Sequence, residues 1–162
     1  MNRHRQSSRG DYRLAHMNAS HLFLLVTLAL CLFCTGASWL LQFVCYPTYA
    51  LVGEKEFVPF HLSFGKRLLI VVIPMSFTCL LLIASLVFRP AGAPLWAAAL
   101  AAVCGAVILL TTIFLEVPKH QQLDREGKSD SVIAALVRDN APRTACWTLA
   151  SVLLVYMVAV AA

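Results

Sequence analysis

The sequence predicts an all-α integral membrane protein, built as a four-helix bundle with short interfacial segments capping one end. Of its 162 residues, 60% are hydrophobic, and the mean hydropathy is +0.77. Charged residues make up 13%, about half of the ~25% in an average soluble domain. Four apolar runs approach the roughly 20 residues that a helix needs to cross a hydrocarbon core of about 30 Å. These runs take up nearly the whole chain, which predicts one domain.

Residues 1–20 are polar and basic and predict a disordered tail. The tail contains four arginines, Arg3, Arg5, Arg9 and Arg13. They suit anionic lipid headgroups better than a nucleic acid. The first spanning helix is predicted over residues 21–46.

The second helix is predicted over residues 59–88. Pro59 suits a first helical position, where its missing N–H would be unpaired anyway. Pro74 falls in the middle of this helix and predicts a kink. Phe57, Phe60 and Phe64 have helical spacing and predict an aromatic group at the membrane interface.

The third helix is predicted over residues 95–116, and Pro118 is expected to end or break it. It carries small residues at four-residue spacing, which let helix backbones approach closely. This face predicts either the centre of the bundle or a homo-oligomer interface. The small residues are Ala97, Ala98, Ala101, Ala102, Gly105 and Ala106.

The last helix is predicted over residues 142–161, with Asn140 or Asp139 as its N-cap and Pro142 in its first turn. A separate short helix is predicted to start at Ser129 or Asp130. Its apolar residues, from Val132 to Val137, would lay it flat on the end of the bundle.

An even number of crossings places the two long connections on the same side of the membrane. The basic tail predicts a cytoplasmic N-terminus with the polar connections on the outer side, because the first helix usually sets the orientation. The count of basic residues favours the opposite orientation, with eight on the side of the connections and five on the side of the tail. The expected location is the inner membrane of a bacterium. The expected partners are the lipid bilayer and a lipophilic small molecule.

Several polar residues fall in or next to the two connections. Glu116 ends an apolar run, and a carboxylate at that depth predicts either a functional group or a paired one. His61, Glu116 and His120 are the candidate metal ligands, so the expected cofactor is a transition metal or none. The competing interpretation is a set of hydrogen-bonded structural groups.

The start of the last helix brings together Asn140, Arg143 and Trp147. A guanidinium next to an indole can stabilise an anion or hold a planar aromatic ligand. An interfacial anchor pair explains the same residues equally well. Gln42, near the end of the first helix, faces this end and needs a partner for its amide.

Together, several short motifs resemble a family of small four-helix bacterial and fungal membrane proteins of mostly unknown function, which includes the anthrone oxygenases. Phe64 and Thr78 stand where the family pattern has a histidine and an acidic residue. The matching motifs are Trp39-Leu-Leu-Gln42, Tyr46-Pro47, Phe60-His61, Pro74-Met75, Glu116-Val-Pro118-Lys-His120, Asn140, Arg143, Trp147 and Tyr156-Met157.

The resemblance implies oxygenation of a polycyclic phenolic substrate, which reacts with oxygen once it is deprotonated and needs no cofactor. His61 or Glu116 would be the base, and Arg143 with Asn140 would stabilise the enolate charge. The ring system would lie against Trp147, Phe57, Phe60 and Phe64. The alternative is a non-catalytic accessory protein, such as a lipid or quinone carrier or a subunit of a complex.

Overall fold

The computed structural model describes residues 3–88 and 92–161, and every regular element within these ranges is helical. Four of its helical stretches are long and apolar enough to cross a membrane. The predicted all-α membrane bundle is therefore confirmed. The elements are α1 (Arg3–Leu40), η1 (Leu41–Cys45), α2 (Tyr46–Thr48), η2 (Tyr49–Leu51), α3 (Glu54–Phe88), α4 (Leu95–Thr111), η3 (Thr112–Glu116), α5 (Val117–Glu126) and α6 (Asp130–Ala161).

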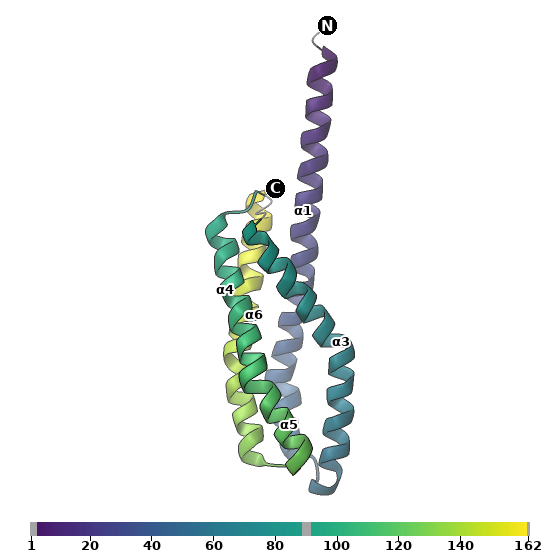
Figure 1. Cartoon of the computed structure of the whole chain (residues 1–162), viewed down its shortest axis with the longest axis vertical. Coiled ribbons are helices and arrows are strands. Elements are labelled where there is room, and N and C mark those ends of the chain that lie inside the picture. The colour runs from purple at the N-terminus through teal and green to yellow at the C-terminus, as the bar shows by residue number, and fades with distance from the viewer. Residues whose placement is uncertain (1–2, 89–91, 162) are drawn as a thin grey trace.

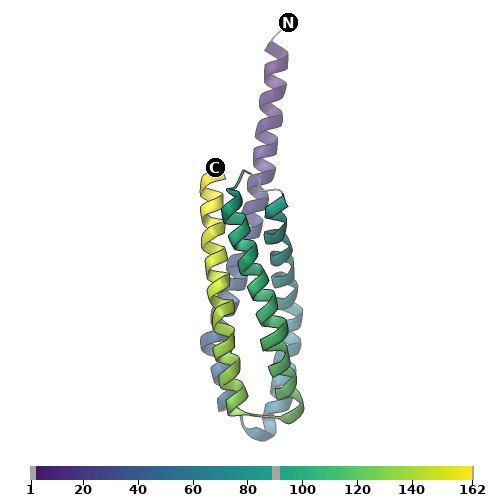
Figure 2. The same cartoon turned by 60° about the vertical axis from the view of Figure 1, so that its left-hand side comes forward.

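The helices run alternately up and down, as Figure 1 shows. The connections at residues 52–53 and 127–129 lie together at the lower end, and the C-terminus lies at the opposite end with the turn before α4 (Figure 2). This confirms that the two predicted connections share one side. We call the lower end, with residues 46–61 and 116–140, the polar end.

Two π-helical turns precede Pro47 and Pro118, the second of which was expected to end or break the helix. The N–H of Tyr46 donates to the carbonyl of Leu41, and that of Val117 donates to the carbonyl of Thr112. Each turn comes just before a proline, Pro47 or Pro118. A proline has no N–H to donate. The wider π-helical turn shifts the backbone hydrogen bonds from i→i+4 to i→i+5, and the α-helix resumes after it. The regular α-helix is thus broken before Pro118, where α4 passes into η3 and α5, but the third helical stretch does not end there and continues to Glu126.

The last helix begins at Asp130 rather than at residue 142, and it contains Pro142. Asn140 is therefore not an N-cap but is buried inside the helix. The predicted short helix is the first part of α6. The reason is a continuous buried face at intervals of three or four residues, formed by Ile133, Leu136, Asn140, Thr144 and Trp147.

The second helix also begins earlier than predicted, at Glu54, so that Pro59 lies inside it. Pro74, where the sequence predicts a kink, lies inside α3, and α3 is bent along its length in Figure 1. The backbone of α1 is helical from Arg3, within the segment expected to be disordered. Once an apolar span has nucleated a helix, adding residues to its end costs little, because nucleation is the unfavourable step.

Four of the six small residues of α4 lie at the centre of the bundle. Ala97, Ala98, Ala101 and Gly105 are buried, the three alanines in a core cluster with Trp147 and other residues of α6 and α1, whereas Ala102 is half-buried and Ala106 is exposed. A second core cluster, around Tyr49 and Phe57, fills the polar end.

Candidate functional site

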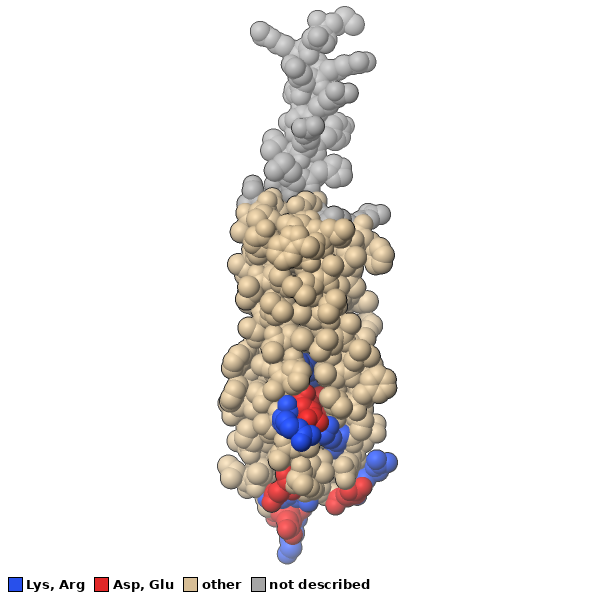
Figure 3. Space-filling view, turned by 90° about the vertical axis from the view of Figure 1, so that its left-hand side faces the viewer, with Lys and Arg blue, Asp and Glu red and all other residues tan. Residues whose placement is uncertain are grey.

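The polar end extends beyond the hydrocarbon. The spanning stretches have 32 to 35 residues and are therefore about 50 Å long, whereas the hydrocarbon core is about 30 Å thick. Figure 3 shows that, among the described residues, Lys, Arg, Asp and Glu gather over the lower part of the bundle. This part is therefore placed where charged groups meet water and lipid headgroups.

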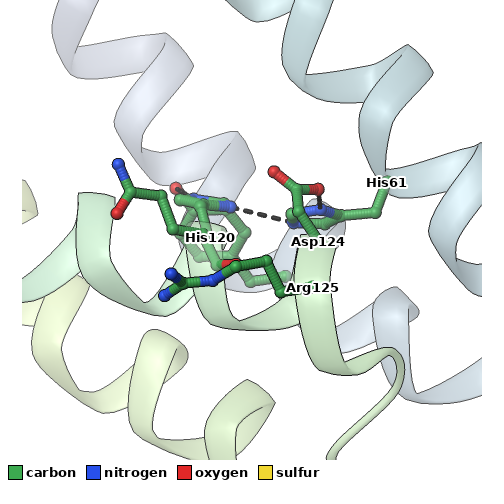
Figure 4. Close-up of polar contacts among 6 residues, drawn as sticks. His61, His120, Asp124 and Arg125 are labelled. Atoms are coloured by element: carbon green, nitrogen blue, oxygen red, sulfur yellow. Dashed lines mark hydrogen bonds and ion pairs between the residues drawn. The ribbon is translucent and has the colours of Figure 1, made fainter.

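Two histidines from different helices are hydrogen-bonded to each other inside this end (Figure 4). Nε2 of His61, on α3, lies 2.9 Å from Nδ1 of His120, on α5. Nδ1 of His61 lies 2.6 Å from Oδ1 of Asp124, and Nε2 of His120 lies 3.4 Å from the hydroxyl of Tyr46. Arg125, drawn beside them, donates to the backbone carbonyl of Gln121 instead.

One arrangement of protons satisfies all three contacts. His61 donates from Nδ1 to the carboxylate of Asp124 and accepts at Nε2 from His120. His120 then accepts at its own Nε2 from the hydroxyl of Tyr46. We call this chain, Tyr46–His120–His61–Asp124, the relay. It links a fully buried hydroxyl to a carboxylate whose side chain is 34% exposed.

Aromatic rings fix the position of His61. Its ring is stacked on Phe57 at a centroid distance of 5.6 Å and meets Tyr49 edge-on at 5.2 Å. Phe60 and Phe64 also pack edge-on against Tyr49. The three phenylalanines predicted to bind a ligand therefore pack against His61 or against its neighbour Tyr49. None of them lines the cavity next to His61.

A cavity of about 300 Å³ lies in front of the relay, between α3 and the η3–α5 segment. This volume is enough for one small molecule. The polar lining residues come from all four spanning stretches, whereas the rest of the wall is apolar. The lining residues are Tyr46, His61, Lys66, Thr112, Glu116, His120, Asp124 and Arg143, with Leu41, Leu62, Gly65, Leu68, Leu69, Val72, Ile73 and Val117.

Glu116 is the most unusual residue of the cavity wall. It is 2% exposed, and neither of its carboxylate oxygens has a hydrogen-bond partner among the described residues. Nε of Arg143, in the same wall, is likewise buried without a partner. A buried carboxylate with no partner is costly. These atoms are therefore available to groups that enter the cavity.

Asn140 and Gln42 form a separate network. Nδ2 of Asn140 donates to Oε1 of Gln42 at 2.8 Å and to Thr144 at 3.2 Å, and Gln42 donates to the carbonyl of Val137 at 2.9 Å. Neither amide lines the cavity. The hydrogen bonds of these two residues instead link α6 to η1.

The predicted metal ligands His61, Glu116 and His120 share the cavity wall but are not arranged around a common point. No group of three His, Cys, Asp or Glu residues suited to a metal occurs within the described part of the chain. The facing nitrogens of the two histidines bond to each other at 2.9 Å. The structure therefore does not assemble the predicted metal site.

Asp124 was absent from the predicted site, and Tyr46 was noted only as part of a motif. The sequence does contain a clue, because Glu116, His120 and Asp124 are spaced by four residues and lie on one helical face. Pro118 between them argued against a continuous helix. The π-helical turn removes that objection.

Three comparisons give no relatives for this chain. No family model, no curated protein and no solved structure matches it.

Proposed function

We propose that this integral membrane protein is an enzyme that deprotonates a lipophilic aromatic small molecule in the cavity and so allows it to react with oxygen, as the anthrone oxygenases that it resembles do. The observation that carries the proposal is the unpartnered, buried carboxylate of Glu116 in an otherwise largely apolar cavity. A base is more effective when it is not occupied by hydrogen bonds within the protein and lies within reach of the substrate.

The reaction is balanced without a further reactant. Glu116 takes a proton from the ring methylene of an anthrone, and the electron pair passes to the ring oxygen as an enolate. Arg143 stabilises the negative charge through its free Nε–H. The enolate forms a C–O bond with molecular oxygen, and loss of water from the hydroperoxide leaves a second ring carbonyl. Both methylene hydrogens and one oxygen atom leave as water.

The relay lies beside this chemistry and leads from the cavity toward water. Tyr46 and His120 line the cavity together with Glu116, and Asp124 is partly exposed. Each member of the relay can accept one proton and release another along the hydrogen bonds, so the cavity can exchange protons with its surroundings. The overall reaction releases no proton, and Glu116 returns to its ionised form when it gives its proton to the peroxide anion, which becomes the hydroperoxide.

The test is oxidation of anthrone by protein reconstituted in phosphatidylcholine vesicles, followed by the absorbance of the anthraquinone formed. We expect turnover by the wild-type protein and a loss of about 10²-fold or more in Glu116→Gln. Glu126→Gln is the matched control, because Glu126 is exposed and lies outside the cavity. Full activity in the double variant His61→Ala, Glu116→Ala would contradict the proposal.

Two glycines on spanning helices allow a test of the cavity itself. A side chain at Gly65, which lines the cavity, meets no atom within 4 Å of its Cβ, and the same is true of Gly36 on the exposed face of α1. Gly65→Leu should fill the cavity and abolish turnover, whereas Gly36→Leu should not. Both replace a glycine in a helix and so should stabilise it by about 1 kcal/mol. Anthrone binding without turnover in the wild-type protein would favour the non-catalytic ligand carrier.

A further inference from the structure

A second, smaller cavity of about 100 Å³ adjoins the first. The two share Val72, Ile73, Thr112 and Arg143 in their walls. Beyond these shared residues the smaller cavity runs between α3 and α4 to Trp147. We call this smaller cavity the crevice. It extends the main cavity away from the polar end, toward the hydrocarbon.

The walls of the crevice are also part of the outer surface of the bundle. Phe77 is 58% exposed, Ile73 45% and Leu109 44%, and all three line the crevice. They lie on α3 and α4, within spanning stretches, so the surface that they share faces lipid. The crevice therefore opens sideways into the bilayer.

The two ends of this continuous space differ in chemistry. The main cavity contains the unpartnered oxygens of Glu116 and the unpartnered Nε of Arg143. In the crevice, the hydroxyl of Thr112 already donates to the carbonyl of Ile108 at 2.7 Å, and the hydroxyl of Ser76 contacts Cys34. Among the described residues that line the two spaces, the fully buried polar side-chain atoms without a hydrogen-bond partner are those of Glu116, in the main cavity, and Nε of Arg143, at the junction.

We infer that the main cavity and the crevice together hold one elongated lipophilic molecule that enters from the bilayer between α3 and α4, with a hydroxyl head at Glu116 and Arg143 and an apolar part against Trp147. The inference extends the proposed function, because it specifies the ligand class and the entry route of the same cavity. A hydroxyl donates to the carboxylate and accepts from the guanidinium, so it meets both unpartnered groups. A phosphate head fits less well, because its charge would face Glu116.

The test measures binding alone, in a protein whose only indole is Trp147. Trp39 and Trp96 are exposed, so the variant Trp39→Phe, Trp96→Phe leaves the emission of Trp147 to be observed. The probe is an alkylphenol with bromine at the end of its chain, added to phosphatidylcholine vesicles that carry the protein. We expect quenching of Trp147 that saturates as the probe is added, because a heavy atom quenches an indole only at close range.

A pair of adjacent substitutions provides the control. Val72 lines both cavities, whereas Val71 lines neither and is 52% exposed to lipid. Val72→Phe should block the crevice and weaken the saturable quenching at least about tenfold, whereas Val71→Phe should leave it unchanged. Glu116→Gln should weaken the binding of the phenol head, and Glu126→Gln should not.

Quenching that does not saturate, or that is the same in Val72→Phe and Val71→Phe, would overturn the inference, because either result means that the bromine acts from the surrounding lipid. Since no turnover is needed, saturable quenching in a protein that fails to oxidise anthrone would reject the proposed function and retain the inference. Oxidation of anthrone without saturable quenching would reject only the inference and retain the proposed function.

Discussion

Glu116 is the residue at which stability and function should conflict most directly. Its buried carboxylate has no hydrogen-bond partner, so folding must take this group out of water without compensation. We expect Glu116→Gln, which keeps the shape and removes the charge, to raise the free energy of unfolding by about 1–2 kcal/mol. The measurement is thermal and denaturant-induced unfolding in detergent at neutral pH.

The control for this effect is again Glu126→Gln. Glu126 is exposed and accepts a hydrogen bond from Gln122 at 2.7 Å, so its loss should change stability by less than about 0.5 kcal/mol. A Glu116→Gln protein less stable than the wild type would mean that the carboxylate is paired in solution, and it would no longer be the available base.

Asp124 should act through His61 and not on the ligand directly. The 2.6 Å contact between Asp124 and Nδ1 of His61 fixes which ring nitrogen carries the proton, so Nε2 can accept from His120. We expect Asp124→Asn to remove the strongly downfield imidazole N–H resonance of His61 in the proton spectrum. Asp130→Asn, at the exposed start of α6, should leave that resonance in place. Its survival in Asp124→Asn would show that the relay is not formed as described.

At the scale of the element, we expect the bend of α3 to keep the cavity open. Pro74 lies inside α3, beside Val72 and Ile73, which line both cavities. A proline inside a helix lacks one hydrogen bond and costs about 3 kcal/mol. We expect Pro74→Ala to raise the thermal midpoint and, by letting α3 straighten toward α4, to weaken binding of the brominated alkylphenol.

Pro94 provides the comparison, because it is the N-cap of α4: its carbonyl accepts from the N–H groups of Ala97 and Ala98, and its missing N–H interrupts no helical hydrogen bond. Pro94→Ala should leave both stability and binding close to those of the wild type. If Pro74→Ala becomes more stable but binds as before, the bend is not what keeps the cavity open.

Periodicity and length were enough to predict four spanning helices, and the boundaries at residues 88 and 95 coincide with the observed ends. Apart from the start of α1, the misplaced boundaries depend on proline. Pro118 and Pro142 were expected to interrupt or begin helices, but a π-helical turn and a continuous buried face carry the chain through them. Such effects depend on packing against other helices, which a local pattern does not contain.

Packing between helices also explains which parts of the site could be predicted from the sequence. His61, His120, Glu116 and Arg143 were identified from their position near the ends of apolar runs, and all four line one cavity. The partners were harder to predict. That His61 bonds to Asp124, or that Asn140 bonds to Gln42 and not to a ligand, depends on the rotation of each helix about its axis.

At the scale of the whole molecule, the distribution of charged residues predicts which side of the membrane holds the polar end. In the sequence, this end together with the neighbouring Lys66, Arg67 and Arg143 contains eight Lys and Arg residues and seven Asp and Glu residues, whereas the opposite end contains five Lys and Arg residues and one Asp. At the polar end Asp139 pairs with Lys119 and Arg138 at 2.8 Å each, and Arg143 lines the cavity. Four of the five basic residues of the opposite end lie in the N-terminal segment, before the first span.

This distribution predicts a cytoplasmic N-terminus and a polar end on the outer face, because positive residues near the first span resist transfer across the membrane. The measurement uses a membrane-impermeant maleimide on intact bacterial cells that express single-cysteine additions. Glu126→Cys, exposed at the polar end, should react in intact cells, and Ala19→Cys, exposed near the start of the first span, should react only after permeabilisation. The reverse pattern would place the relay on the cytoplasmic side, so that Asp124 would exchange protons with the cytoplasm.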